Sequence, residues 1–146
     1  MIFDTKYIFS DKQAITADAA STNVIDLGTN GVPHGGIEAL KRDIGKGSKI
    51  PLTIQVTEDF AALTSLSISV QSSDDSGFGS FVTHGSTGSV DLADLKSGWQ
   101  SGFDGIPHAG TGEMGRYLRL YYDVTGANAT AGKITAAITA GTQTNG

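Results

Sequence analysis

Alternation of apolar and polar residues is the strongest pattern in this chain, and it predicts β-strands. Within residues 116–124, one face of an extended segment would carry Leu118, Leu120, Tyr122 and Val124. Side chains of a strand alternate between its two faces, so this face can be buried while tyrosines and charged residues occupy the other. Aromatic and β-branched residues also favour a pleated, half-buried surface. We expect residues 116–124 to form a central strand of the main sheet.

The same period of two recurs along the chain between clusters of turn-forming residues. The further strands expected from it are residues 13–17, 23–28, 51–57, 66–71, 78–83, 89–92 and 133–140. One helical turn is expected at residues 37–41, short turns at residues 61–63 and 126–128, and a long Gly-rich loop at residues 96–115. About eight short strands with long connections predict an all-β domain, a two-sheet antiparallel sandwich of the jelly-roll type.

Length and composition narrow the class of protein. A chain of 146 residues predicts a single domain spanning residues 1–146, and we assign residues 1–12 to an N-terminal arm and residues 141–146 to a polar tail. With no cysteine, disulfides and thiolate metal sites are excluded. The net charge is −5 and the ten Lys and Arg are scattered, so direct nucleic-acid binding is not expected. No apolar run is long enough to span a membrane and no signal peptide is recognisable, so we expect a soluble protein with no membrane partner.

The N-terminal arm is unusually apolar for a chain terminus. Its large apolar side chains are Ile2, Phe3, Tyr7, Ile8 and Phe9. Termini are commonly disordered unless something holds them. These side chains are therefore expected to be buried, either on their own domain or on a neighbouring molecule.

Residues that carry catalytic or metal chemistry do not occur in a recognisable spacing. The histidines, His34, His84 and His108, are far apart, so we expect no metal site. Serines abound, but no Gly-x-Ser-x-Gly elbow occurs, and the Gly-rich loops lack the lysine of a phosphate-binding loop. Spacing alone leaves open a pair of distant carboxylates of the glycosidase kind. We expect no enzymatic activity and no cofactor.

Three groups of residues are candidates for contacts with a partner. His34 and His108 each follow a proline and precede small residues, which predicts display on tight turns, as contact points or as ordinary loop residues. Trp99 and Phe103 would form either a sugar-stacking platform or plugs that close one end of the sandwich. The non-core face of residues 116–124 carries aromatic and Arg side chains, which interfaces enrich, although the N-terminal arm of the same chain is an alternative cover. This face consists of Tyr117, Arg119 and Tyr121.

Residues 4–16 and 19–28 resemble the opening of the Bbp16-like capsid cement proteins of tailed bacteriophages. The shared features are an aromatic residue followed by Phe-Ser-Asp-x-Gln-Ala, and then Ser-Thr-x-x-Ile-Asp-Leu-Gly. Later segments of the pattern follow in the expected order at residues 52–57, 66–72, 79–83 and 116–122.

The resemblance implies a jelly-roll protein that binds the outer surface of an assembled capsid and bridges neighbouring major capsid proteins. It implies a virion protein made in the host cytoplasm, whose partners are the major capsid protein and its own copies, as a homodimer or homotrimer. It implies no catalytic residue. The interface residues that we expect are Ile2, Phe3, Tyr7, Ile8, Phe9, His34, Trp99, Phe103, His108, Tyr117, Arg119 and Tyr121. Deletion of residues 1–10 would then abolish shell binding and leave the β fold intact. The alternative function is a lectin-like virion surface module that uses the Trp99 and Phe103 loop.

Overall fold

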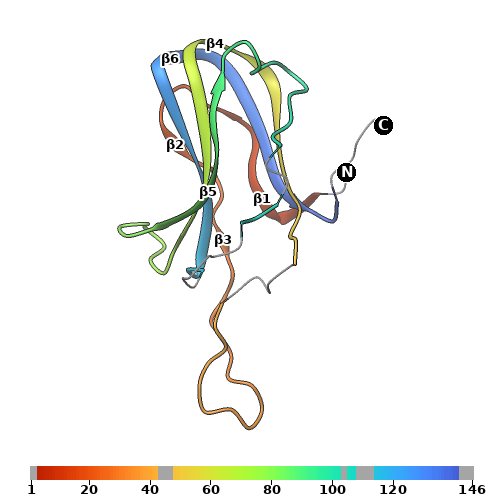
Figure 1. Ribbon diagram of the computed structural model, residues 1–146, viewed down its shortest axis with the longest axis vertical. Helices are drawn as coiled ribbons and strands as arrows, with labels where there is room; N and C mark the ends of the chain where they lie inside the picture. Colours follow the sequence, from red (N-terminus) through yellow and green to blue (C-terminus); the bar gives the residue numbers. More distant parts are fainter. Residues whose placement is uncertain (1–2, 43–47, 103–104, 108–113, 142–146) are drawn as a thin grey trace.

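The chain folds into one connected antiparallel sheet. The computed structural model describes residues 3–42, 48–102, 105–107 and 114–141. The sheet has six strands in the order β1-β6-β4-β5, and β2 and β3 also pair with β6 (Figure 1). The strands are β1 (Phe3–Ala14), β2 (Ala19–Ala20), β3 (Ile25–Asp26), β4 (Leu52–Ser73), β5 (Val82–Asp91) and β6 (Tyr117–Thr139). The described residues contain no helix, so the prediction of an antiparallel all-β protein is confirmed. In this part of the chain, accordingly, no helix is long and apolar enough to cross a membrane.

Two long strands, β4 and β6, form the backbone of the sheet. They pair along their whole length, from Leu52 opposite Ile138 to Ser73 opposite Tyr117. The expected breaks at residues 61–63 and 126–128 are wrong, because both strands continue through a bend. The pairing register shifts repeatedly between Val56 and Ser65, and bulges of this kind bend a strand without ending it. We call this bend the arch: residues 58–65 of β4 and residues 124–133 of β6.

Backbone conformation at the arch depends on unusual φ angles. Gly126 has φ 94° and Gly132 has φ 135°, a region that favours glycine. Ala62 has φ 76° despite its Cβ atom, and such strain persists only where the surroundings impose it. Side-chain periodicity alone therefore does not predict that residues 52–73 form one strand.

The arch folds the sheet over, so that its two halves face each other (Figure 1). β1 pairs with the C-terminal half of β6, while β2 and β3 pair with its N-terminal half. A buried hydrogen bond of 2.7 Å joins Ser10 Oγ of β1 to Tyr122 Oη of the opposite half. The Ser10 hydroxyl donates to Gln13 Oε1 at 2.7 Å, so its single proton is used and Tyr122 is the donor to Ser10. Burial raises the pKa of Tyr122 far above its usual value, which keeps this phenol protonated.

The core lies between the two halves and consists of the apolar faces that the alternation predicted. Its largest fully buried side chains are Phe9, Ile15, Leu52, Ile54, Phe60, Leu66, Ile68, Leu95, Leu118, Leu120, Tyr122 and Ile134. The apolar alternate residues of 51–57, 66–71 and 116–122 are buried, as the alternation predicted. Residues 133–140 differ from the prediction that Ile134, Ala136, Ile138 and Ala140 share the inward face, because Ala137 and Thr139 are buried as well, Ile138 is half-buried and Ala140 is exposed.

The N-terminal arm is a strand of the sheet. Residues 3–14 form β1, whereas the sequence predicted a strand only from residue 13. Phe9 is completely buried in the core of its own chain, so we remove it from the expected interface. Deletion of residues 1–10 would remove most of an integral strand, so the expectation that the fold survives that deletion is corrected.

Other boundaries also differ from the prediction. Residues 78–81 lie outside any strand, with a bend at residues 79–80, and the strands expected at 78–83 and 89–92 are one strand, β5. The helical turn expected at residues 37–41 is not formed; residues 37–38 are a bend in an exposed loop. Residues 98–101 and 105–106 follow residues 50–56 at the edge of β4, where Gln100 bridges to Gln55 and Gly105 to Pro51.

Candidate interaction surface

Exposed apolar side chains gather at one end of the molecule. Among the described residues, nine large hydrophobic side chains are exposed: Phe3, Tyr7, Val24, Leu27, Val32, Ile37, Leu40, Phe81 and Val82. Phe3 lies opposite Thr139 and Val82 opposite Ser72, at the ends of β6 and β4 that are farthest from the arch. We call this end, with the loop that extends from it, the stalk end. Exposed apolar side chains are therefore concentrated at one end of the sheet, and exposed apolar patches mark interaction sites.

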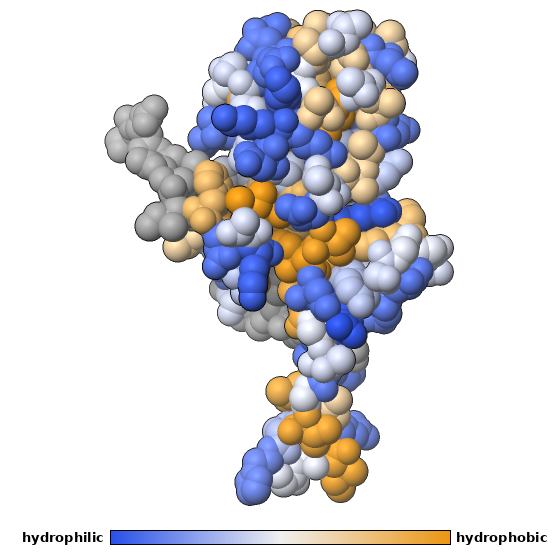
Figure 2. Space-filling model, turned by 180° about the vertical axis from the view of Figure 1, so that it is seen from behind, coloured by the Kyte–Doolittle hydropathy of each residue, from blue (hydrophilic) through white to orange (hydrophobic). Residues whose placement is uncertain are grey.

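Residues 27–42 form the most prominent feature of the stalk end, a long loop that projects away from the sheet (Figure 1). We call this loop the stalk. Every residue from 29 to 41 is exposed. Ile37 is 98% exposed, close to the value for a side chain in full contact with water. Apolar side chains colour the distal part of the stalk in Figure 2, and those with large exposure are Val32, Ile37 and Leu40.

Hydrogen bonds hold the root and the turn of the stalk in place. At the root, the Leu27 N–H donates to Arg116 O at 2.8 Å, and Arg42 Nη2 donates to Gly28 O at 2.5 Å. Arg42 also lies 3.7 Å from the Asp74 carboxylate. Farther out, the Leu40 N–H donates to Gly31 O at 3.0 Å, which closes the loop on itself. The stalk is therefore a formed projection with a fixed base.

The tip of the stalk is built on a tight turn. The Gly36 N–H donates to Pro33 O at 2.8 Å. Gly35 has φ 78°, a positive value that this position of the turn requires and that glycine adopts without steric cost. His34 lies on this turn and is exposed, as the sequence predicted for a histidine between Pro and Gly.

An apolar hollow of about 420 Å³ opens at the root of the stalk. Leu27 and Arg42, the two ends of the stalk, both line it. The other lining residues are Tyr7, Ile50, Ile106, Met114, Leu118 and Ile138. Apart from Arg42, the lining is almost entirely hydrocarbon and aromatic. We call this feature the root hollow.

The predicted aromatic face of β6 is covered by the loop that follows β4. The Arg119 guanidinium lies 4.0 Å from the ring centroid of Phe78 and 5.4 Å from that of Phe81, within cation–π distance. Its Nε donates to Gln71 Oε1 at 2.9 Å, and burial lowers the pKa of Arg119 from its ordinary value. Tyr121 is also close, at 5.5 Å. Phe78, and not the N-terminal arm, therefore packs on this face.

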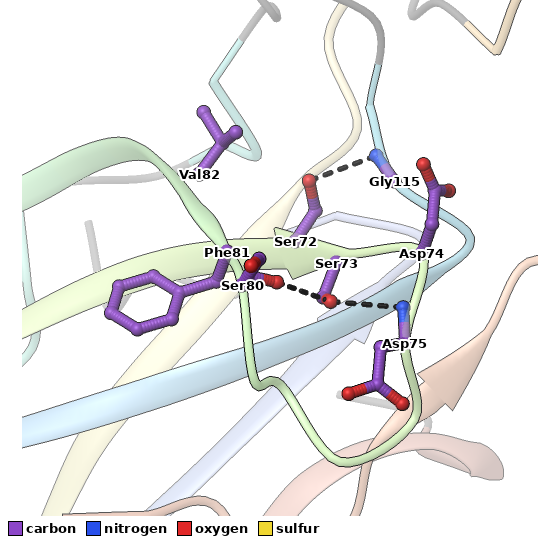
Figure 3. Close-up of a pocket in the computed structure, with 8 residues that line it drawn as sticks. All are labelled: Ser72, Ser73, Asp74, Asp75, Ser80, Phe81, Val82 and Gly115. Carbon is purple, nitrogen blue, oxygen red and sulfur yellow. Dashed lines mark hydrogen bonds between the residues drawn. The ribbon is translucent and has the colours of Figure 1, made fainter.

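A smaller hollow of about 320 Å³ lies beside this loop, between β4 and β5 (Figure 3). Ser73 Oγ donates to Ser80 O at 2.5 Å and accepts from the Asp75 N–H at 3.0 Å. The Asp75 carboxylate accepts from the N–H groups of Gly77 and Gly79, both at 3.1 Å, and these bonds lower its pKa. These polar groups are occupied in holding the loop.

Ser72 and His84 form the pair that most resembles a nucleophile and its base. Ser72 Oγ lies 2.6 Å from His84 Nε2 and accepts from the Gly115 N–H at 2.9 Å. Ser72 is among the residues that line the hollow of Figure 3, but it is only 1% exposed and both of these contacts engage its hydroxyl. The pKa of His84 is lowered by burial, which favours the neutral form of the ring. We interpret the pair as a structural tie between β4 and β5.

The remaining predicted residues are dispersed. Trp99 is partly buried and packs against the core, as the plug interpretation requires. Phe3 and Tyr7 are exposed at the stalk end, Ile8 is half-buried, and Tyr117 lies beneath the Arg116 guanidinium at 5.1 Å. Ile2, Phe103 and His108 lie outside the described residues. Within the described ranges, no group of three His, Asp or Glu residues is placed to hold a metal ion.

Sequence reasoning missed the apolar residues of the stalk. Val32, Ile37 and Leu40 are isolated among Gly, Pro and charged residues, so no periodicity draws attention to them. The available signal was large aliphatic residues inside a segment whose turn chemistry excludes a strand, because such residues have no sheet face on which to be buried.

The family model described as Bbp16 matches residues 9–138. A search of curated proteins gives no match.

Proposed function

The chain belongs to the Bbp16 family, and from this premise we propose that it is a non-enzymatic capsid cement protein of a tailed bacteriophage. It binds the outer surface of the assembled shell and bridges neighbouring major capsid proteins, and it is present in the virion as a homo-oligomer. The matched residues cover the second half of β1, all of β2 to β5 and all but the last residue of β6.

The single observation that carries this proposal is the concentration of exposed apolar side chains at the stalk end. Nine large hydrophobic residues are exposed there, whereas the arch presents ion pairs such as Lys133 with Glu58 and Lys96 with Asp59. A protein that attaches to a shell needs one adhesive end and one hydrated end. We propose that the stalk end faces the capsid and the arch faces outward.

The bent sheet suits this role mechanically. We propose that its two facing halves are the two sheets of a jelly roll, in which β4 and β6 run through both. Because β4 and β6 continue through the arch, a force on one end of the molecule is carried along their covalent backbone. Copies that associate can grip several capsid subunits together, and linked contacts of this kind reinforce one another. Binding only the assembled shell stabilises that form by mass action.

Co-sedimentation with undecorated shells tests the proposal. Purified protein is titrated against shells of the encoding phage in compact and in expanded form. Saturable binding to the expanded form, near one copy per capsid subunit, is the expected result. Failure to bind either form would overturn the proposal.

The lectin-like alternative is tested in parallel. Glycan-array binding that is lost on Trp99→Ala would favour it. Because Trp99 packs against the core, the matched control is Trp99→Phe, which keeps an aromatic ring there. We expect no glycan signal for either variant or for the unaltered protein.

A further inference from the structure

We propose that two copies of this chain associate through their stalks, each tip inserting into the root hollow of the other copy. The inference rests on the proposed function and deepens it, because it assigns the self-association expected there to specific surfaces. Of the exposed apolar residues at the stalk end, it leaves Phe3, Val24, Phe81 and Val82 for the capsid. It rests on three features: an apolar tip that its own chain leaves exposed, an apolar hollow at the stalk root, and the placement of both on one projection.

The tip has the properties of an inserting group. Val32, Ile37 and Leu40 are 57%, 98% and 60% exposed, which is unfavourable for aliphatic side chains unless a partner covers them. The turn from Pro33 to Gly36 and the bond from Leu40 to Gly31 fix the tip before it binds. A preorganised projection loses little conformational entropy on association.

The root hollow has the complementary chemistry. Its volume of about 420 Å³ lies within the range of roughly 300–1,000 Å³ typical of pockets that take compact ligands. Its walls include Ile50, Leu118 and Ile138, which match aliphatic guests. Arg42 is the one charged residue of the lining, and Glu38 is the neighbour of Ile37 at the tip. Insertion of Ile37 would bring the guest Glu38 carboxylate near the host Arg42 guanidinium, so the charges are complementary as well.

Symmetry makes the two contacts simultaneous. The hollow lies at the root of the same stalk that carries the tip, since Leu27 and Arg42 belong to both. Two stalks of equal length placed antiparallel bring each tip to the root of the other. A two-fold axis between them therefore generates two identical contacts, the isologous arrangement that closes a dimer.

Disulfide trapping tests the contact directly, because the natural chain has no cysteine. The full-length double variant Ile37→Cys with Leu27→Cys is oxidised in solution without shells. We expect a disulfide-linked dimer by non-reducing electrophoresis, doubly linked by mass spectrometry. The control pairs Leu27→Cys with Asn128→Cys at the exposed arch and is expected to remain monomeric on the gel. A double variant that forms no link, or only an intramolecular one, overturns the proposal.

A complementation experiment tests reciprocity by sedimentation equilibrium. Ile37→Asp damages the tip, and Leu27→Asp damages the hollow. Each alone loses both contacts, and we expect its dimer dissociation constant to rise by about 100-fold or more. The mixture retains one intact tip and hollow, so a heterodimer is expected to form more tightly than either homodimer. Val82→Asp, at a residue of similar exposure to Val32 but off the stalk, serves as the matched control and is expected to dimerise normally.

Shell binding separates this inference from the proposed function. If the chain is monomeric in solution yet decorates shells, the stalk exchange is wrong and the cement function stands. If Ile37→Asp dimerises normally but no longer decorates shells, the tip contacts the capsid and the exchange is wrong. If the dimer forms as described but never binds shells, only the cement function fails.

Discussion

The arch and the stalk end are opposite ends of the same sheet, and they differ in whether their apolar side chains are buried or exposed. At the arch, β4 and β6 bend around buried residues, and positive-φ glycines lie tightly against their neighbours. At the stalk end the chain leaves the sheet, and apolar side chains are exposed to water. From this difference we infer that the arch determines the stability of the fold, while the stalk end determines which partner the protein binds. Substitutions at the two ends should therefore separate stability from association.

The largest expected effect is on the arch glycines. A Cβ atom at Gly132, where φ is 135°, would overlap the ring of Phe60. Gly132→Ala adds backbone strain to overpacking, and we expect it to lower the free energy of unfolding by about 3–5 kcal/mol. Urea denaturation followed by circular dichroism measures this change.

The matched control for Gly132→Ala is Gly35→Ala on the stalk. Gly35 also has a positive φ, of 78°, but a Cβ atom there meets nothing within 4 Å. Backbone strain alone remains, and we expect a loss of about 1 kcal/mol or less. Equal losses at the two positions would contradict the distinction between a structural arch and a separate stalk.

A smaller effect is expected at the hydrogen bond that joins the two halves of the sheet. Tyr122→Phe removes the buried donor to Ser10, and Ser10→Ala leaves the Tyr122 hydroxyl without that acceptor. We expect each to destabilise by about 1–3 kcal/mol, with Ser10→Ala the more harmful because it leaves a buried polar group unpaired. A double-mutant cycle on urea midpoints should give a coupling of at least about 0.5 kcal/mol, and additive effects would show that the bond contributes nothing specific.

Association should respond to substitutions that leave stability unchanged. Val82→Asp places a charge among the exposed apolar residues of the stalk end, and we expect about a tenfold loss of affinity for expanded shells, worth about 1.4 kcal/mol. Asn128→Asp adds the same charge at the exposed arch and should bind as the natural protein does. Both unfolding midpoints should remain within about 0.5 kcal/mol of the natural value. A reversed order in the co-sedimentation assay would mean that the arch faces the capsid.

The smallest expected effect concerns the ion pair beside the stalk root. Asp26 accepts from Arg116 Nε at 2.7 Å and Nη2 at 2.8 Å, and from the Gly28 N–H at 2.8 Å. These bonds, led by that of Arg116, lower the pKa of Asp26 from 3.8 to about 2. The charged form is favoured in the folded state, so its stabilising contribution is complete above pH 4 and is lost as the pH falls toward 2.

Asp26→Asn should remove this contribution at neutral pH and flatten the acid limb of the stability profile. Because the pair is exposed to solvent, the change is small, and increasing salt should shrink it further. Thermal denaturation of both proteins between pH 2 and pH 6 measures the difference. Parallel profiles would show that Asp26 does not contribute to acid sensitivity.

The sequence by itself determined the inward faces of residues 51–57, 66–71 and 116–122. Alternation placed Leu52, Ile54, Leu118 and Leu120 in the core, because a strand with one apolar face has only one way to be buried. Its motif near the N-terminus also indicated the Bbp16 family, which the match over residues 9–138 supports. Local chemistry predicted the turn that displays His34, since Pro and Gly impose backbone angles wherever they occur.

Only the tertiary structure decided how these pieces connect. Ala62 adopts a positive φ because β6 pairs with β4 on both sides of it. Alanine has no intrinsic preference for a positive φ, so the sequence does not predict this conformation. Phe78 covers Arg119 because their segments meet across the sheet, and β1 is a strand because residues 133–139 offer it an edge. The root hollow combines residues from 7 to 138, which only folding brings together. Side-chain periodicity reports which face is buried, whereas long-range pairing decides where a strand bends, which loop projects and what surface remains for a partner.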